Sequence, residues 1–238
     1  MRMRKTILAS MIIFMFIMLF FSIIKAENWD TAKGLEWEFT VTKVGKLVIY
    51  SKHKVVGQDQ WYGQKVWVIE GEITYFDPVE NYQTKELLRL DLNYRYLTYE
   101  SHMNYKGYVF NTTLEWNGKQ YYIYKDALGK EDAFYYTEPV FYYDPFMVYM
   151  LDILIKSKSV EFDKQYTVWG QMVTKITLLS QSGGEFLTPS GPVKAKVYQI
   201  PEFNRILYLG ANQEVVGVED PDKGLVFYRG NWVKELLE

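Results

Sequence analysis

The chain has 238 residues, no cysteine and a formal net charge of −2. The lack of cysteine excludes disulfides, thiol catalysis and thiolate metal sites. Without the four cations of the N-terminal segment, residues 27–238 contain 23 Lys and Arg against 29 Asp and Glu, a net charge of −6. An acidic domain has no electrostatic reason to bind nucleic acid or anionic lipid, so the sequence predicts neither partner.

The N-terminus has the pattern of an export signal. A basic start precedes 18 uncharged residues from Ile7 to Ile24, and Ala26 follows shortly after. This pattern predicts a secretory signal peptide, while the apolar length also suits an uncleaved membrane anchor. We therefore predict a signal peptide or membrane anchor at residues 1–26, which contacts the membrane if it is retained. Residues 27–238 are then a single extracytoplasmic β domain, in the periplasm or at the cell surface.

Alternating apolar and polar residues predict that strands make up most of the remaining chain. In the first predicted strand, Trp37, Phe39 and Val41 alternate with polar residues, which is typical of a half-buried strand. Further strands are predicted at 47–56, 65–76, 85–92, 96–103, 108–116, 120–125, 165–179, 184–187, 193–200, 205–209, 215–219 and 224–229. Asn117-Gly118 is a strong hairpin signal between two of them. Short strands separated by turn residues indicate an antiparallel meander.

One helix interrupts the strands. Asp144-Pro145 suits a helix start, and Phe146, Met150 and Leu154 follow at helical spacing. Nearly every position through residue 155 is apolar except Asp152, which predicts a helix buried on most sides. The predicted fold is therefore mainly β: a curved antiparallel sheet or half-open barrel with one buried apolar helix, preceded by the N-terminal signal or anchor helix.

Residues 140–229 carry a family resemblance in the order of their turns and strands. The helix is followed by a strand pair and then by Glu185-Phe186-Leu187-Thr188-Pro189-Ser190-Gly191, a short strand that ends in a T-P-x-G turn. This order resembles domain-of-unknown-function family 3108, a set of exported bacterial proteins. More distantly, the predicted fold is similar to the lipoprotein carrier and receptor group (LolA and LolB), which implies a half-open barrel with a hydrophobic cavity. Neither resemblance supplies a matched site motif, so no residue role is carried over.

Few side chains in the sequence suggest a reaction. The two histidines, His53 and His102, lie in predicted strands among polar neighbours, which indicates surface or hydrogen-bonded structural roles. Two isolated histidines without cysteine are a poor ligand supply, so we predict neither a metal site nor a cofactor. Glycoside hydrolysis needs only two facing acids. A hydrolase built on strand carboxylates therefore stays open, although we predict no enzyme; the candidates are Glu70, Glu72, Asp91 and Glu115.

The leading functional hypothesis is a non-enzymatic binding or carrier protein of the cell envelope. Its partner would be a hydrophobic ligand, a lipid-linked partner or an envelope protein held against the concave sheet. The predicted ligand-binding residues are large and apolar, a kind of residue that more often fills an ordinary core: Trp37, Phe39, Trp67, Phe146, Met147 and Met150. One alternative is a carbohydrate-binding module that uses Trp61-Tyr62 or Tyr142-Tyr143. Another is a structural envelope protein that recruits a second chain by sheet-edge pairing.

Overall fold

The computed structural model describes most of the predicted β domain. It covers residues 35–78, 81–92, 95–125, 130–135, 141–142, 148–156, 162–169 and 173–237. The signal or anchor predicted at residues 1–26 lies outside these ranges. Among the helices within them, none combines the length and apolarity needed to cross a membrane.

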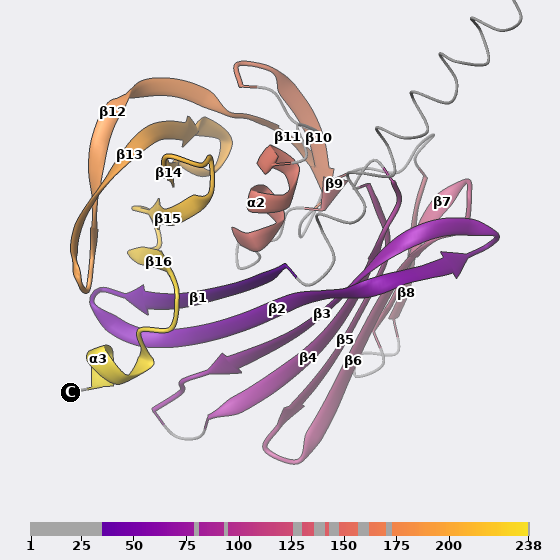
Figure 1. Cartoon of the computed structure of the whole chain (residues 1–238). Coiled ribbons are helices and arrows are strands. Elements are labelled where there is room, and N and C mark those ends of the chain that lie inside the picture. Colours follow the sequence, from indigo (N-terminus) through magenta and orange to yellow (C-terminus); the bar gives the residue numbers. More distant parts are fainter. Residues whose placement is uncertain are drawn as a thin grey trace, which may run out of the picture. The chain divides into compact units, whose positions relative to one another are not determined.

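Thirteen of the described strands form one antiparallel sheet that does not close, and Figure 1 shows it curving around a short helix. Their order is β12-β13-β14-β15-β16-β1-β2-β3-β4-β5-β6-β7-β8. The strands with lower numbers are β1 (Glu36–Lys43), β2 (Lys46–Trp61), β3 (Gln64–Tyr75), β4 (Tyr82–Leu90), β5 (Tyr96–Tyr105), β6 (Tyr108–Trp116), β7 (Gln120–Lys125) and β8 (Lys130–Tyr135). The others are β12 (Leu179–Thr188), β13 (Gly191–Ile200), β14 (Arg205–Leu209), β15 (Val215–Asp220) and β16 (Leu225–Arg229).

A second, smaller sheet and three helical segments complete the described elements. The small sheet has the order β11-β10-β9, in which β9 is parallel to β10. These strands are β9 (Phe141–Tyr142), β10 (Gln165–Trp169) and β11 (Val173–Thr177). The helical segments are α2 (Val148–Lys156), a single 3₁₀ turn at Pro201–Phe203, and α3 (Val233–Leu237).

The predicted mainly β fold with one buried helix is confirmed, and several strand boundaries are wrong. The strand predicted at 165–179 is two strands of the small sheet, β10 and β11. The polar stretch after Val56 was predicted to turn, yet β2 continues to Trp61 because a bulge at Val55 and Gly57 keeps the ladder with β3 intact. The residues between the predicted strands 165–179 and 184–187 likewise lie inside β12, where the register shifts between Ser180 and Gly183.

Three hairpins have turns of the same type. At Val44-Gly45, Tyr62-Gly63 and Lys106-Gly107 both turn residues have positive φ, between 45° and 78°. Two successive positive φ angles define the type I′ turn, whose twist matches that of the paired strands. Asn and Gly adopt these angles most easily, so a Val, Tyr or Lys at the first position is a strained choice.

The face of the large sheet that contacts α2 is called the inner face here, and its opposite the outer face. Trp37 and Phe39 on β1 and Trp67 on β3 lie on the inner face, and each is at most 3% exposed. The outer face of β1, predicted to be solvated, is also covered at Thr40. The Thr40 hydroxyl donates to the Gly230 carbonyl at 2.8 Å and accepts from the Trp232 backbone N–H at 2.9 Å. The C-terminal segment therefore closes this part of the outer face.

Two tyrosines are expected to make the fold less stable at alkaline pH. Burial, followed by the nearby Glu38 carboxylate, raises the pKa of Tyr50 to about 12. Burial and Glu219 raise the pKa of Tyr208 to about 12 in the same way. The native state thus keeps protons that the unfolded state loses near pH ~10. Their stabilising contribution is present below about pH 10 and is lost as the pH rises toward 12.

We therefore expect the free energy of unfolding to fall between about pH 10 and pH 12. The fall should be shallower in Tyr208→Phe, because that variant lacks one of the tyrosine hydroxyls whose pKa is raised in the native state. Urea unfolding of the wild type and the variant across this range measures both slopes. Equal slopes would show that Tyr208 contributes nothing to the alkaline loss.

Candidate functional site

A buried carboxylate fixes α2 against the inner face of the sheet. Asp152 is fully buried, although the helix around it is apolar. Its Oδ2 accepts a hydrogen bond from Trp37 Nε1 at 2.6 Å, and its Oδ1 accepts from the Val215 backbone N–H at 2.7 Å. Arg229 Nη1 lies 3.2 Å from the same Oδ1 and also donates to the Val215 carbonyl. Three strands, β1, β15 and β16, thus bind one side chain of the helix.

The predicted ligand-binding residues that the structure describes lie on the inner face or on α2. Trp37, Phe39 and Trp67 line the inner face, and Met150 on α2 has no exposed surface. Every residue from Val148 to Ile155 is buried, which agrees with the prediction of a helix buried on most sides. The inner face therefore forms an apolar trough that α2 occupies. The other two predicted ligand-binding residues, Phe146 and Met147, lie outside the described residues.

A second polar network lies further along the inner face. His53 on β2 is 1% exposed, and its Nε2 is 3.0 Å from Oε2 of Glu86 on β4. The Tyr99 hydroxyl donates to the other Glu86 oxygen at 2.7 Å. The His53 ring stacks on Tyr149 of α2, with ring centroids 3.8 Å apart. This network therefore links the central strands to the helix.

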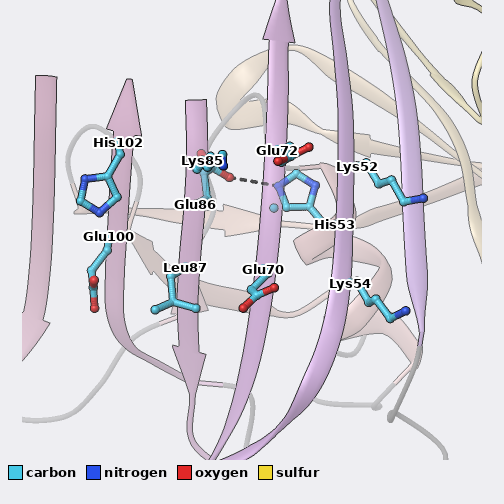
Figure 2. Close-up of a pocket in the computed structure, with 11 residues that line it drawn as sticks. Lys52, His53, Lys54, Glu70, Glu72, Lys85, Glu86, Leu87, Glu100 and His102 are labelled. Carbon is cyan, nitrogen blue, oxygen red and sulfur yellow. Dashed lines mark hydrogen bonds and ion pairs between the residues drawn. The ribbon is translucent and has the colours of Figure 1, made fainter. Parts of the chain in front are cut away.

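Gly71 makes this network possible. It lies on β3, between His53 and Glu86 in the strand register. A Cβ at this position would lie 2.2 Å from Cδ2 of His53, so the imidazole passes over a backbone that carries no side chain. Figure 2 shows the ring reaching across β3 toward Glu86. A glycine inside a strand indicates such a close approach, and this signal was available in the sequence.

Both histidines have hydrogen-bond partners, as predicted. Nδ1 of the exposed His102 is 2.7 Å from Oδ1 of Asn111. His53 is engaged by Glu86 at Nε2 and covered by Tyr149 on its ring face. A general base has to reach a substrate proton, and a ring held in this way does not present itself to solvent. The geometry of His53 therefore fits a structural role.

The outer face of the same strands is hollowed into a charged depression of about 520 Å³ (Figure 2). Lys52 and Lys54 point away from it, toward the acids of β1; Lys54 Nζ is 2.8 Å from Glu36. Around the depression lie side chains of both charges and a single aliphatic one, namely Glu70, Glu72, Lys85, Leu87, Glu100 and His102. Such a lining suits a small charged group better than an acyl chain.

The four candidate carboxylates lie in three different places. Glu70 and Glu72 line this outer depression. Asp91 closes the turn between β4 and β5, where its Oδ1 accepts from the Arg95 backbone N–H at 2.8 Å. Glu115 accepts a hydrogen bond from the Tyr62 hydroxyl at 2.7 Å. Asp91 and Glu115 are therefore engaged at different places on the sheet.

These features define a mainly β protein, built on one open antiparallel sheet with a helix fixed to its inner face. No family model matches the chain, and no curated protein matches it in sequence. The resemblances to family 3108 and to the lipoprotein carriers therefore remain predictions.

Two solved structures are similar in fold. One is a beta-barrel-like protein of domain of unknown function DUF1849 from Brucella abortus, with a TM-score of 0.44 and 6% identity over 82% of this chain and 92% of that one. The other is a DUF1089 family protein from Pseudomonas aeruginosa, with a TM-score of 0.39 and 13% identity over 70% of this chain and 87% of that one. Neither similarity bears on function.

Proposed function

We propose that the protein is a non-enzymatic binding or carrier protein of the cell envelope, and that its ligand is an apolar chain. The observation that carries the proposal is the burial of α2 from Val148 to Ile155 along the inner face. A surface that covers an apolar helix on this scale also suits an acyl chain, because burial of apolar area is non-directional. The export signal predicted from the sequence is the reason for proposing the cell envelope as the location of the protein.

The hydrogen bonds that Asp152 accepts provide a way for α2 to exchange places with a ligand. Apolar contacts alone would let the helix slide or rotate, whereas the hydrogen bonds to Asp152 hold it at one position. In this proposal the helix leaves the trough as a unit when that anchor opens. An apolar chain then packs against Trp37, Phe39 and Trp67 on the inner face. Of these, Trp37 contacts α2, with its ring centroid 6.1 Å from that of Tyr149.

Binding of an environment-sensitive apolar dye tests this function. We expect saturable dye binding that long-chain fatty acids displace, and an affinity several-fold lower in Trp67→Leu, because that change removes apolar contact area from the inner face against which the ligand packs. Leu187→Ala is the matched control, since Leu187 lies on β12 and is 71% exposed. Circular dichroism establishes that each variant is folded. Dye binding that is absent, or equally strong in both variants, would count against the trough.

A further inference from the structure

The tip of the β2–β3 hairpin folds over the outer face of the sheet. Tyr62 lies in the turn, yet its hydroxyl donates to Oε1 of Glu115, which is on β6, three strands beyond β3. Next to it, the ring of Trp61 faces the guanidinium of Arg89 on β4, with 4.8 Å between the guanidinium carbon and the ring centroid. The hairpin tip therefore spans from β4 to β6 and does not extend freely into solvent.

The backbone of Tyr62 is strained. It adopts a φ of +45°, a strained region that a bulky residue rarely occupies. Its side chain is nevertheless 77% exposed, so burial gives little in return. Val44 and Lys106 adopt similar angles in the other two type I′ turns, so the strain belongs to the turn and the case for a ligand rests on the groups around Tyr62.

The surroundings of Tyr62 combine aromatic surface with hydrogen-bonding groups. The rings of Trp61 and Tyr62 meet edge to face, with centroids 5.2 Å apart. Tyr122 on β7 pairs with Glu115 and is 47% exposed, which adds a third aromatic ring on the far side of that carboxylate. We call Trp61, Tyr62, Arg89, Glu115 and Tyr122 the hairpin platform.

The charges around the hairpin platform limit the classes of ligand that it can bind. Arg89 is paired with Glu100 at 2.8 Å and lies 3.9 Å from a carboxylate oxygen of Asp59. With Glu115 included, acids outnumber the single cation by three to one. A phosphate or carboxylate ligand would be repelled. An apolar chain would leave these charged groups unsatisfied.

We propose that the hairpin platform binds a neutral oligosaccharide. A sugar ring has a C–H face that packs on an aromatic ring and a rim of hydroxyls that exchange hydrogen bonds with carboxylate and guanidinium groups. The hydrogen bond from Tyr62 to Glu115 holds both groups in place before the ligand arrives, which lowers the cost of binding. This site lies on the outer face and does not depend on the proposed apolar ligand of the trough.

A substitution in the β2–β3 turn tests the hairpin platform and is not expected to destabilise the fold. Asn is favoured at the first position of a type I′ turn, so Tyr62→Asn removes the ring and the hydroxyl while relieving the strain. Lys106→Asn makes the same change in the matching turn of the β5–β6 hairpin. We expect both variants to unfold at or above the wild-type temperature. Only Tyr62→Asn should weaken saccharide binding, by about tenfold or more.

The probes are hexaoses of β-1,4-linked glucose and of β-1,4-linked N-acetylglucosamine, measured by isothermal titration calorimetry. The full exported protein is used, in a detergent without a sugar headgroup where one is needed. Glu115→Gln keeps a carbonyl acceptor and should weaken binding only several-fold. Binding of a hexaose that is lost in Tyr62→Asn and retained in Lys106→Asn establishes the site. If neither hexaose binds the wild type, or if Tyr62→Asn binds as well as the wild type, the proposal is wrong.

Discussion

Replacing Asp152 with alanine is expected to lower the free energy of unfolding by about 3–5 kcal/mol. The change leaves the Trp37 indole N–H and the Val215 backbone N–H buried without their carboxylate acceptor. A buried donor that loses its partner costs about 1–3 kcal/mol, and the ion pair with Arg229 is lost as well. Urea unfolding at neutral pH measures the effect.

The control for this variant is Asp59→Ala. The Asp59 side chain is 56% exposed, lies 3.9 Å from Arg89 and accepts an exposed hydrogen bond from the Gln60 backbone N–H, so its removal should cost less than about 1 kcal/mol. A similar loss in both variants would mean that Asp152 is an ordinary surface acid. It would also remove the anchor on which the proposed release of α2 depends.

The second large effect is expected at Gly71. Alanine there places a methyl group where the His53 ring lies, so the ring must leave both Glu86 and Tyr149. We expect a loss of about 2–4 kcal/mol, from overpacking together with a broken buried hydrogen bond. Gly57→Ala is the matched control, because no atom lies within 4 Å of a Cβ built at Gly57.

A double-mutant cycle separates the clash from a general effect of alanine in β3. In a His53→Ala background the ring is gone, so Gly71→Ala should cost less than about 1 kcal/mol. The coupling free energy between positions 53 and 71 should then account for most of the stability that Gly71→Ala loses on its own. Equal costs in both backgrounds would contradict the close approach of His53 to the Gly71 backbone.

Local patterns in the sequence were enough to predict part of this fold. The strands 108–116 and 120–125 match β6 and β7 because Asn117-Gly118 fixes their turn and register. Burial of the helix followed from its continuous apolar run. By contrast, the extension of β2 past Gly57 depends on pairing with β3 across a bulge, and a polar stretch gives no signal of that.

The candidate sites were harder to predict, because their contacts join distant parts of the chain. Asp152 stood out as the one acid in an apolar helix, but its partners are 115 residues before it and 63 and 77 residues after it. Trp61 and Tyr62 were singled out as a pair of neighbouring aromatics. That Glu115 and Arg89 lie beside them depends on the hairpin folding over the outer face, which no local pattern indicates.

The measurement that tests the proposed carrier function most directly is native mass spectrometry of the protein purified from the envelope of its own host. The proposal predicts a reproducible added mass that transfers into organic solvent and is diminished in Trp67→Leu. A bare protein mass, from material that also binds no apolar dye, would contradict it and leave α2 as a permanent part of the core.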